Sequence, residues 1–370
     1  MPHTSRTYLR PMGMIPAATA GAAETEAQNV LGLPLSNTGR MFTAVEVAQR
    51  SGSRVDRRAM TVSEVFQREW PDPVELAEVV ERLTTPRGRF AGLDLARPRI
   101  MGIVNVTPDS FSDGGQHAGV ERAVAHAMAL VAAGADIIDI GGESTRPGSD
   151  AVAVEEELAR VVPVIRALRE KTDAVISIDT RKAEVMKQAA RAGADILNDV
   201  SALTHDPAAL ETAERLGLPI ILMHAQGDPK TMNDDPQYGD LVLDVYDFLA
   251  SRIAACEASG IPRTKLCVDP GIGFGKHLKH NVAMMASLSI LHGMGVPILL
   301  GASRKKMIGQ LCDVPNAKDR VPGSLATVLV AAEQGVQIMR VHDVAETAQA
   351  LAVWRASTIG LEPRAITVGA

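Results

Sequence analysis

The chain has 370 residues, of which 46% are hydrophobic and only 3% aromatic, so its core must be mainly aliphatic. This length allows one large domain with an appended segment, or two domains. The net charge of −6 argues against a general binder of nucleic acid or anionic membranes, because such proteins carry a basic excess.

The cysteines and the hydropathy pattern bear on the compartment. Cys256, Cys267 and Cys312 lie far apart without the paired spacing of a metal site. Cys267 lies in an apolar run and is interpreted as an inert core residue. No segment approaches the roughly 18 apolar residues of a membrane span, and the N-terminus lacks the apolar region of a signal peptide. We therefore expect a soluble cytoplasmic protein.

Residues 1–95 are predicted to form an N-terminal extension of short helices and irregular structure, and the sequence does not indicate its role. The segment 12–40 is rich in Ala, Gly, Pro, Asn and Thr and is expected to be poorly ordered. Two helices are predicted where a threonine precedes a glutamate by three positions, one starting at Thr43 and one at Thr61. A third helix is predicted near 74–84.

The remainder, 96–370, alternates short apolar runs with stretches of helical spacing. The runs are continuously apolar, as expected for parallel strands covered on both faces. Predicted helices over 121–134 and 181–193 end at glycines, which are natural helix stops. The predicted strands lie at about 100–105, 136–140, 174–178, 195–199, 219–223, 266–269, 296–300 and 337–341.

Eight strands alternating with helices over this length predict an α/β protein of the (β/α)8 TIM-barrel class. An open doubly wound sheet is the alternative. It would normally show a Gly-rich phosphate-binding turn after its first strand. The first predicted strand is followed instead by TPDSFSDGG, a polar loop of the kind that often carries binding groups.

In a barrel of this class the active site lies at the C-terminal ends of the strands. Single polar residues there have ordinary explanations: Asp179 could cap a helix, and His224 could be a satisfied core histidine. Those explanations do not account for polar residues at all eight ends. These are Asn105, Glu143 to Arg146, Asp179, Asn198 and Asp199, His224, Asp269, Ser303 to Lys305, and Arg340 and His342.

Seven ordered segments carry a family resemblance. They are GIVNVTPDSFSDGG (102–115), IDIGGESTRPGSD (138–150), SIDTRK (177–182), ILNDVSAL (196–203), CVDPGIGFGK (267–276), GASRKKMIG (301–309) and IMRVHDV (338–344). Together they resemble the dihydropteroate synthase family, the pterin-binding transferases of folate biosynthesis. The likeness covers roughly 98–360 and leaves the N-terminal extension unmatched.

The resemblance implies condensation of 6-hydroxymethyl-7,8-dihydropterin pyrophosphate with p-aminobenzoate, giving 7,8-dihydropteroate and pyrophosphate. Asp179, Asn198 and Asp269 would hold the pterin, because a carboxylate accepts two adjacent N–H bonds. Lys305 would donate to the ring carbonyl, and the flat guanidinium of Arg340 would stack on the ring.

The resemblance also implies a pyrophosphate site at Asn105, Arg340 and His342. Mg²⁺ would bridge Asn105 and phosphate oxygens, since this ion keeps several waters and needs few protein ligands. The residues given a catalytic role are therefore Asn105, Asp179, Lys305, Arg340 and His342.

For p-aminobenzoate, the resemblance implies a pocket whose carboxylate end lies near the start of a helix. Its amine would capture a methylene cation left by departing pyrophosphate. The pocket residues are Thr145, Arg146, Pro147, Phe274, Ser303 and Lys306, with Asp109 and Phe111 in a lid loop. Family likeness further implies a homodimer through the last helices, and the apolar 325–332 segment is compatible with it.

Three positions depart from the family pattern: Ala225, where methionine is expected, Ala202, where glycine is usual, and Lys306. None of them removes a residue with a chemical role. Two rival functions remain, a corrinoid-dependent methyltransferase with a similar pterin grip and a catalytically silent barrel. The first has no use for two lid loops, predicted at 106–117 and 143–150. The second would be expected to have lost some of Asn105, Arg146, Lys305, Arg340 and His342.

Overall fold

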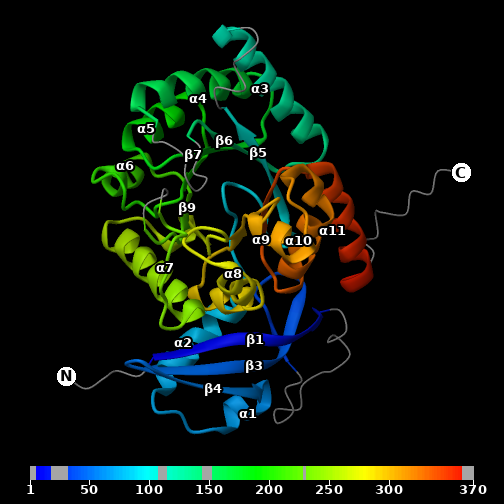
Figure 1. Cartoon of the computed structure of the whole chain (residues 1–370). Helices are drawn as coiled ribbons and strands as arrows, with labels where there is room; N and C mark the ends of the chain where they lie inside the picture. Colours follow the sequence, from blue (N-terminus) through cyan, green and yellow to red (C-terminus); the bar gives the residue numbers. More distant parts are fainter. Residues whose placement is uncertain (1–5, 18–31, 107–114, 144–151, 228–230, 361–370) are drawn as a thin grey trace, which may run out of the picture.

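A computed structural model describes residues 6–17, 32–106, 115–143, 152–227 and 231–360 of the chain. Most of them form eight parallel strands surrounded by helices, as the sequence predicts (Figure 1). The barrel strands are β5 (Arg99–Asn105), β6 (Ile137–Gly141), β7 (Val175–Asp179), β8 (Ile196–Asp199), β9 (Ile220–Met223), β10 (Leu266–Asp269), β11 (Leu299–Leu300) and β12 (Ile338–Val341).

Neighbouring strands are joined in the order β10-β9-β8-β7-β6-β5-β12-β11. A parallel bridge between Val268 and Ile298 connects the two ends of this sheet, so the barrel closes. Closure leaves no open edge for another strand to join. β11 is shorter than predicted, with only two residues in regular strand geometry.

Alternation along each strand divides the apolar side chains between two cores. Ile137 points into the barrel with Ile196 and Ile338, whereas Ile138 and Ile140 pack outward under the helices. The continuously apolar strands are therefore explained by burial on both faces. Closer to the C-terminal ends of the strands, the same alternation turns polar side chains such as Asp139 toward the barrel axis.

The predicted helix over 181–193 corresponds to α5 and ends at Gly193, as the sequence predicts. α5 and α6 stop at Gly193 and Gly217, which adopt left-handed backbone angles, φ 113° and 63°. The helices are α3 (Gly115–Ala132), α4 (Val154–Arg169), α5 (Ala183–Ala192), α6 (Ala209–Leu216), α7 (Leu241–Ala258), α8 (Leu278–Met285), α9 (Lys306–Cys312), α10 (Val321–Glu333) and α11 (Val344–Thr358). Short 3-10 turns are η3 (Arg263–Lys265), η4 (Leu288–Met294) and η5 (Ala317–Arg320).

The N-terminal extension is mainly an antiparallel sheet rather than short helices and irregular structure. Its strands are β1 (Arg6–Pro16), β2 (Leu33–Pro34), β3 (Arg40–Ser51) and β4 (Arg54–Thr61), followed by α1 (Val62–Gln67) and α2 (Pro73–Thr84). The helices predicted at Thr61 and near 74–84 are confirmed, and Thr61 and Glu64 form the expected capping box. The prediction of poor order over 12–40 is wrong for 12–16 and 33–34, which are in strands.

The helix predicted at Thr43 is wrong, because these residues belong to β3. Val45 and Val47 are buried on one face, while Glu46 lies between them and binds Arg10 of the neighbouring β1. Pairing with a strand far away in sequence thus outweighs a local spacing that is compatible with a helix cap.

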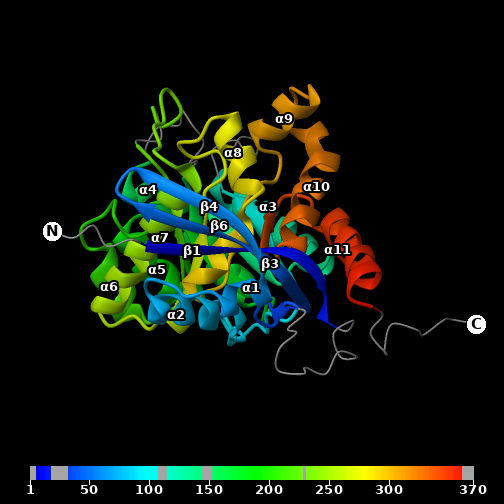
Figure 2. The same cartoon turned by 90° about the horizontal axis from the view of Figure 1, so that it is seen from below.

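The extension packs against the side of the barrel, on α7 and η4 (Figures 1 and 2). The Tyr8 hydroxyl donates to Asp247 of α7 at 2.9 Å, and the Tyr8 ring meets Tyr246 edge-on at 5.2 Å. Ser289 of η4 donates to the carbonyl of Pro11 at 2.8 Å. The extension is therefore anchored to the second half of the barrel.

The floor of the barrel is closed by the segment that precedes β5. Phe90 and Leu95 are both 1% exposed and join the inward-facing core with Met101 and Cys267. Phe90 and Leu95 therefore pack with the barrel although they precede residue 96. Burial also agrees with the interpretation of Cys267 as a core residue.

Candidate functional site

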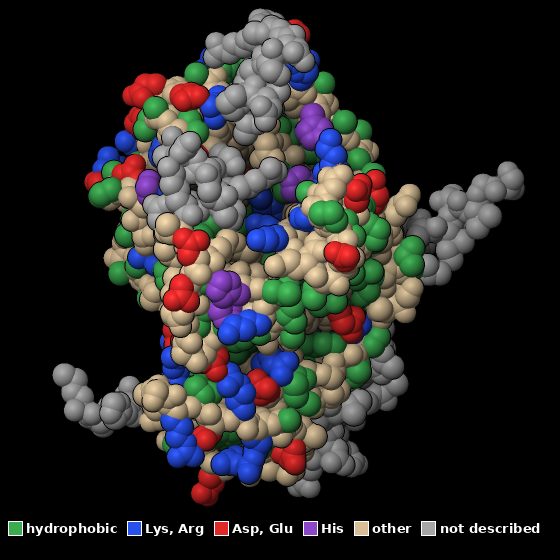
Figure 3. Space-filling model, viewed as in Figure 1, with side chains coloured by type: hydrophobic (Ala, Val, Ile, Leu, Met, Phe, Trp, Pro, Cys, Tyr) green, Lys and Arg blue, Asp and Glu red, His purple; other side chains and the backbone are tan. Residues whose placement is uncertain are grey.

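Polar side chains gather at the C-terminal mouth of the barrel, where Figure 3 shows a hollow lined in part by Lys or Arg and His side chains. Register explains the gathering, because Gly141 pairs with Asp179 and Asp179 with Asn198 across consecutive strands. Strand ends in register place their last side chains at one height. Asp269 ends β10 on the other side of the same mouth.

A network of ion pairs and hydrogen bonds joins four strands beneath this hollow, β6, β7, β8 and β12. Arg340 of β12 donates from Nε to Asp139 at 2.7 Å and from Nη2 to Asp179 at 2.8 Å. The amide nitrogen of Asn198 donates to both oxygens of Asp139 at 3.3 Å. The structure thus brings together Asp179, Asn198 and Arg340, three of the residues predicted for the pterin.

Asp139 was not predicted as a site residue, although it is fully buried and holds both Arg340 and Asn198. The sequence did contain a signal for it. In the strand IIDIG, Asp139 lies two positions before the last residue, so strand alternation places its side chain on the same inward face as that of Ile137.

Asp179 has one carboxylate oxygen without a partner among the described residues. Its Oδ2 accepts from Arg340, while Oδ1 is buried and receives no hydrogen bond there. Burial raises the pKa of Asp179, the Arg340 charge opposes that rise, and Asp139 reinforces it. A buried acceptor of this kind is costly unless a ligand satisfies it.

Asp269, Phe274 and Lys305 form a second group at the mouth. The Lys305 ammonium lies 4.0 Å from the centroid of the Phe274 ring, within cation–π range. Burial raises the pKa of Asp269, whereas the nearby Lys305 charge lowers it. Lys305 thus interacts with both Phe274 and Asp269 at this side of the mouth.

A buried lysine behind this group was also not predicted. Lys276 is 3% exposed, and its ammonium lies 2.8 Å from Nδ1 of His224. His224 packs edge-on against Phe248 at 5.0 Å, and burial lowers its pKa to about 2. His224 is thus a satisfied, neutral core histidine, which was the ordinary explanation for its position.

The remaining described candidates lie around the rim. Ser303 is hydrogen-bonded to His342, with its hydroxyl 3.0 Å from Nδ1 and accepting from the backbone N–H at 3.2 Å. Ser303 therefore orients His342 in this structure. Asn105 ends β5 with an exposed side chain, and Lys306 is exposed at the first turn of α9.

Five predicted residues lie outside the described part of the chain: Asp109, Phe111, Thr145, Arg146 and Pro147. The residues that bracket the second loop are described. Glu143 accepts from the backbone N–H of Val152 at 3.0 Å and from Arg181 at 3.1 Å, and Lys182 lies 3.2 Å from it. These contacts lower the pKa of Glu143 despite its burial.

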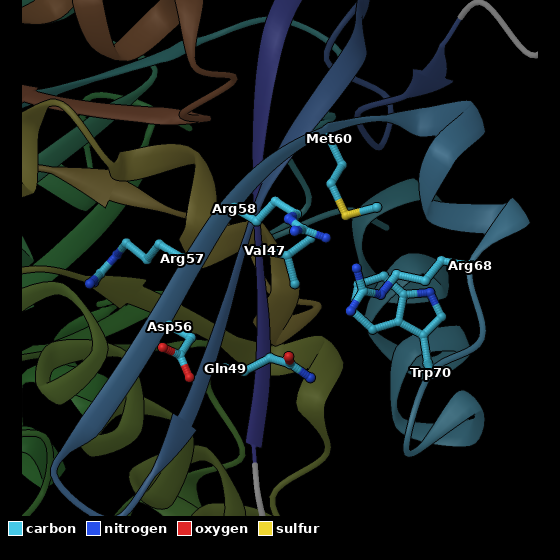
Figure 4. Close-up of a pocket in the computed structure, with 8 residues that line it drawn as sticks. All are labelled: Val47, Gln49, Asp56, Arg57, Arg58, Met60, Arg68 and Trp70. Atoms are coloured by element: carbon cyan, nitrogen blue, oxygen red, sulfur yellow. The ribbon is translucent and has the colours of Figure 1, made fainter.

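A separate cavity of about 260 Å³ lies in the N-terminal extension. Figure 4 shows it between the β3–β4 sheet and the segment that carries Arg68 and Trp70. Val47 and Met60 form part of its wall. The cavity contains none of the residues predicted for the site.

Across the part of the chain that the structure describes, no helix combines the length and apolar character needed to cross a membrane. The same residues contain no cluster of three or more His, Cys, Asp or Glu side chains suited to hold a metal ion.

Comparison with known proteins gives one consistent family. A family model described as pterin binding enzyme matches residues 101–342. The dihydropteroate synthase of Escherichia coli (strain K12) is 51% identical over 265 residues, covering 72% of this chain and 93% of that protein. The synthase of Haemophilus influenzae is 48% identical over 265 residues, with 72% and 96% covered.

Solved structures agree in fold. A Yersinia pestis dihydropteroate synthase in a sulfonamide drug complex has a TM-score of 0.68 and 52% identity, covering 72% of this chain and 96% of that one. The Xanthomonas albilineans enzyme in complex with 7,8-dihydropteroate has a TM-score of 0.65 and 49% identity, covering 72% and 95%.

Proposed function

Because the chain belongs to the dihydropteroate synthase group of the pterin-binding enzyme family, we propose that it condenses 6-hydroxymethyl-7,8-dihydropterin pyrophosphate with p-aminobenzoate. The products are 7,8-dihydropteroate and pyrophosphate, so the enzyme is a transferase. The observation that carries the proposal is the buried Oδ1 of Asp179, an unsatisfied acceptor beside Asn198 and Arg340 at the barrel mouth.

The pterin is held by its amino-pyrimidinone edge. Asp179 Oδ1 accepts one ring N–H, and Asp269 accepts from the opposite side, while Asn198 both donates and accepts. Arg340 remains paired with Asp139 and Asp179, so its guanidinium is fixed in a plane against which the ring can stack. Lys305 donates to the pterin carbonyl.

The pyrophosphate lies toward Asn105, Arg340 and His342. Ser303 fixes the imidazole of His342, and the Arg340 charge stabilises negative charge that develops on the departing group. The exposed Asn105 amide at the end of β5 fits Mg²⁺, which needs few protein ligands when phosphate and water supply the rest. When bound, Mg²⁺ would neutralise charge on the leaving pyrophosphate.

In the reaction, the bond between the pterin methylene carbon and the pyrophosphate oxygen breaks, and both electrons leave with pyrophosphate. The neutral amine of p-aminobenzoate then forms the carbon–nitrogen bond and loses a proton to solvent. Phe274, below the Lys305 ammonium, provides a wall for the aminobenzoate ring, with Thr145, Arg146, Pro147, Ser303 and Lys306 as further contacts. The enzyme contributes positioning, charge stabilisation and exclusion of water. Asp109 and Phe111 are proposed as lid-loop residues.

The proposal includes assembly and location. A homodimer through α10 and α11 is supported by exposed apolar side chains on both helices, Val330 at 46% and Val353 at 68% exposure. The cytoplasm is the proposed location, because its reducing conditions suit three unpaired cysteines.

The decisive experiment measures pyrophosphate release from the pterin substrate with and without p-aminobenzoate, together with the dihydropteroate formed. Release that depends on p-aminobenzoate and matches the product in amount supports the proposal. An Asp179→Ala variant serves as the inactive control. Absence of dependence on p-aminobenzoate in the folded wild type would overturn it.

Sulfonamides should inhibit by competing with p-aminobenzoate. They carry an aniline amine and a polar sulfonyl group at the opposite end, so they match the proposed pocket beside Phe274. The expected pattern is a raised KM for p-aminobenzoate at unchanged kcat, measured in initial-rate assays. Inhibition that competes only with the pterin would contradict the placement of the pocket.

A further inference from the structure

The loop after β10 is held unusually close to the end of β9. Gly271 and Gly275 have positive φ angles of 67° and 62°. A Cβ on Gly271 would lie 1.9 Å from the carbonyl oxygen of His224, and one on Gly275 would lie 2.8 Å from that of Gln226. No larger residue fits either position without moving the loop, so its path depends on close backbone contact.

Lys276 binds this loop from within. Its ammonium contacts Nδ1 of His224 at 2.8 Å, and it donates to the carbonyls of Gly271 at 3.0 Å and Phe274 at 3.1 Å. An ammonium has three N–H donors, and here each has an acceptor. Because the two carbonyls bracket the turn from Gly271 to Phe274, these bonds fix the direction in which Phe274 leaves the backbone.

His224, the acceptor that follows β9, is itself fixed. The backbone N–H of His224 donates to the carbonyl of Asp269 at 3.0 Å, and its ring packs against Phe248 of α7. Since His224 is neutral and Nδ1 faces an ammonium, Nδ1 carries the lone pair and Nε2 the proton. Lys276 therefore connects Phe274 to a rigid part of the barrel.

Phe274 in turn determines the surroundings of a site residue, because the Lys305 ammonium lies 4.0 Å from its ring centroid. We infer that Lys276 is a positioning residue: it holds the turn that orients Phe274 and, through that ring, the ammonium of Lys305. It does so without contacting substrate. The inference rests on the proposed function for its kinetic consequences, but not for its structural ones.

The structural test uses full-length protein labelled with ¹³C at the lysine ε-carbons. A ring 4.0 Å from Nζ shifts the Lys305 ε-proton resonance upfield, and a Lys305→Met spectrum assigns it. In Lys276→Met the linear stem remains but all three donors are lost, so the upfield shift should collapse. The control is Lys265→Met. Lys265 lies in the η3 turn, and its ammonium donates to the Gly217 carbonyl at 2.5 Å.

The kinetic test compares the same variants. Loss of charge-assisted bonds to the turn should raise KM for p-aminobenzoate, whose pocket wall is Phe274, by about tenfold. KM for the pterin substrate should rise as well, because Lys305 donates to the pterin carbonyl. Lys265→Met is expected to change thermal stability without changing either KM. Equal effects of the two variants on the Lys305 resonance and on both KM values would overturn the inference. An inactive wild type would reject the proposed function while leaving the resonance test intact.

Should Lys276→Met not fold, wild-type protein provides a second measurement. Burial lowers the pKa of Lys276 to about 7, with the Lys305 charge adding to the effect and Asp269 opposing it, while His224 stays neutral. Above that pH the amine has two donors for three acceptors, so KM for p-aminobenzoate and the Lys305 resonance should change together as pH rises. The ε-carbon resonance of Lys276 reports the pH range in which its amine titrates. If KM for p-aminobenzoate and the Lys305 resonance both stay constant across that range, the inference is overturned.

Discussion

The two carboxylate oxygens of Asp179 have different surroundings, and Asp179→Asn tests both. Oδ2 accepts from Arg340 and Oδ1 is left for a ligand. In asparagine one of these atoms becomes an NH₂ group, which must face either Arg340 or the pterin N–H as donor to donor. An unsatisfied buried polar group costs about 1–3 kcal/mol, so pterin affinity should fall on the order of 10- to 100-fold. Calorimetric titration with the pterin pyrophosphate measures it.

Asp199→Asn is the matched control for that change. Asp199 is also buried at a strand end, but its oxygens accept from Ser201 and Leu203 in its own turn. Its substitution should lower stability and leave pterin affinity nearly unchanged. Equal affinity in wild type and Asp179→Asn would remove Asp179 from the site.

Asp139 should influence the pH dependence of pterin binding through Asp179. The carboxylate form of Asp179 is the acceptor, so binding is lost as pH falls through its pKa. Burial raises that pKa, and the neighbouring Asp139 charge raises it further. Asp139→Asn removes this repulsion, and the acid limb of kcat/KM for the pterin should move to lower pH. An acid limb of the pH–rate profile that stays at the same pH, or moves to higher pH, would contradict the assignment.

At the scale of elements, the hydroxyl of Tyr8 tests how β1 is attached to α7. Tyr8→Phe keeps the ring contact with Tyr246 but removes the hydrogen bond to Asp247. Asp247 retains Arg6 and Arg50 as partners, so the loss should be about 1 kcal/mol of unfolding free energy. Urea denaturation of the full chain measures it, and kcat should not change. A change in kcat would indicate that the extension acts on the active site.

At the scale of the whole molecule, the extension should be removable without loss of chemistry. A chain that begins at residue 96 is expected to keep p-aminobenzoate-dependent activity, because the described site residues all lie at or beyond Asn105. A chain that begins at residue 87 should be more stable, since it retains Phe90 and Leu95 in the barrel floor. Each such side chain contributes about 1.5–3 kcal/mol when buried.

Thermal denaturation and initial rates of the two shortened chains and the full chain provide the measurement. Folded but inactive shortened chains, beside an active full chain, would show that the extension takes part in catalysis. Equal stability of the two shortened chains would contradict the role assigned to Phe90 and Leu95.

Sequence alone predicted the barrel and much of its mouth because both depend on local patterns. Parallel strands in register share one rim, so Asp179, Asn198 and Asp269 could be placed near each other from their positions at strand ends. Asp139 was missed because it lies inside an apolar run, where only the inward alternation reveals it. Lys276 was missed because the Gly-rich segment before it gives no indication that the side chain turns back into that loop.

The extension was harder to predict for a different reason. β3 pairs with β1, and Arg10 and Glu46 are 36 positions apart in sequence. The residues around Thr43 do not indicate pairing with β1. The spacing of Thr43 and Glu46, which is typical of a helix start, is the only local signal, and it predicts the wrong element. The capping box at Thr61 was predicted correctly because its whole hydrogen-bond pattern lies within four residues.

The anchoring of β1 on the second half of the barrel has a consequence for biosynthesis. Tyr8 binds Asp247, 239 positions later in the chain, and Pro11 binds Ser289, 278 positions later. At about 5–20 residues per second, the first strand leaves the ribosome on the order of ten to fifty seconds before its docking surface exists. During that interval the side of β1 that packs on the barrel has no partner there, whereas its hydrogen-bonding edge can already pair with β3.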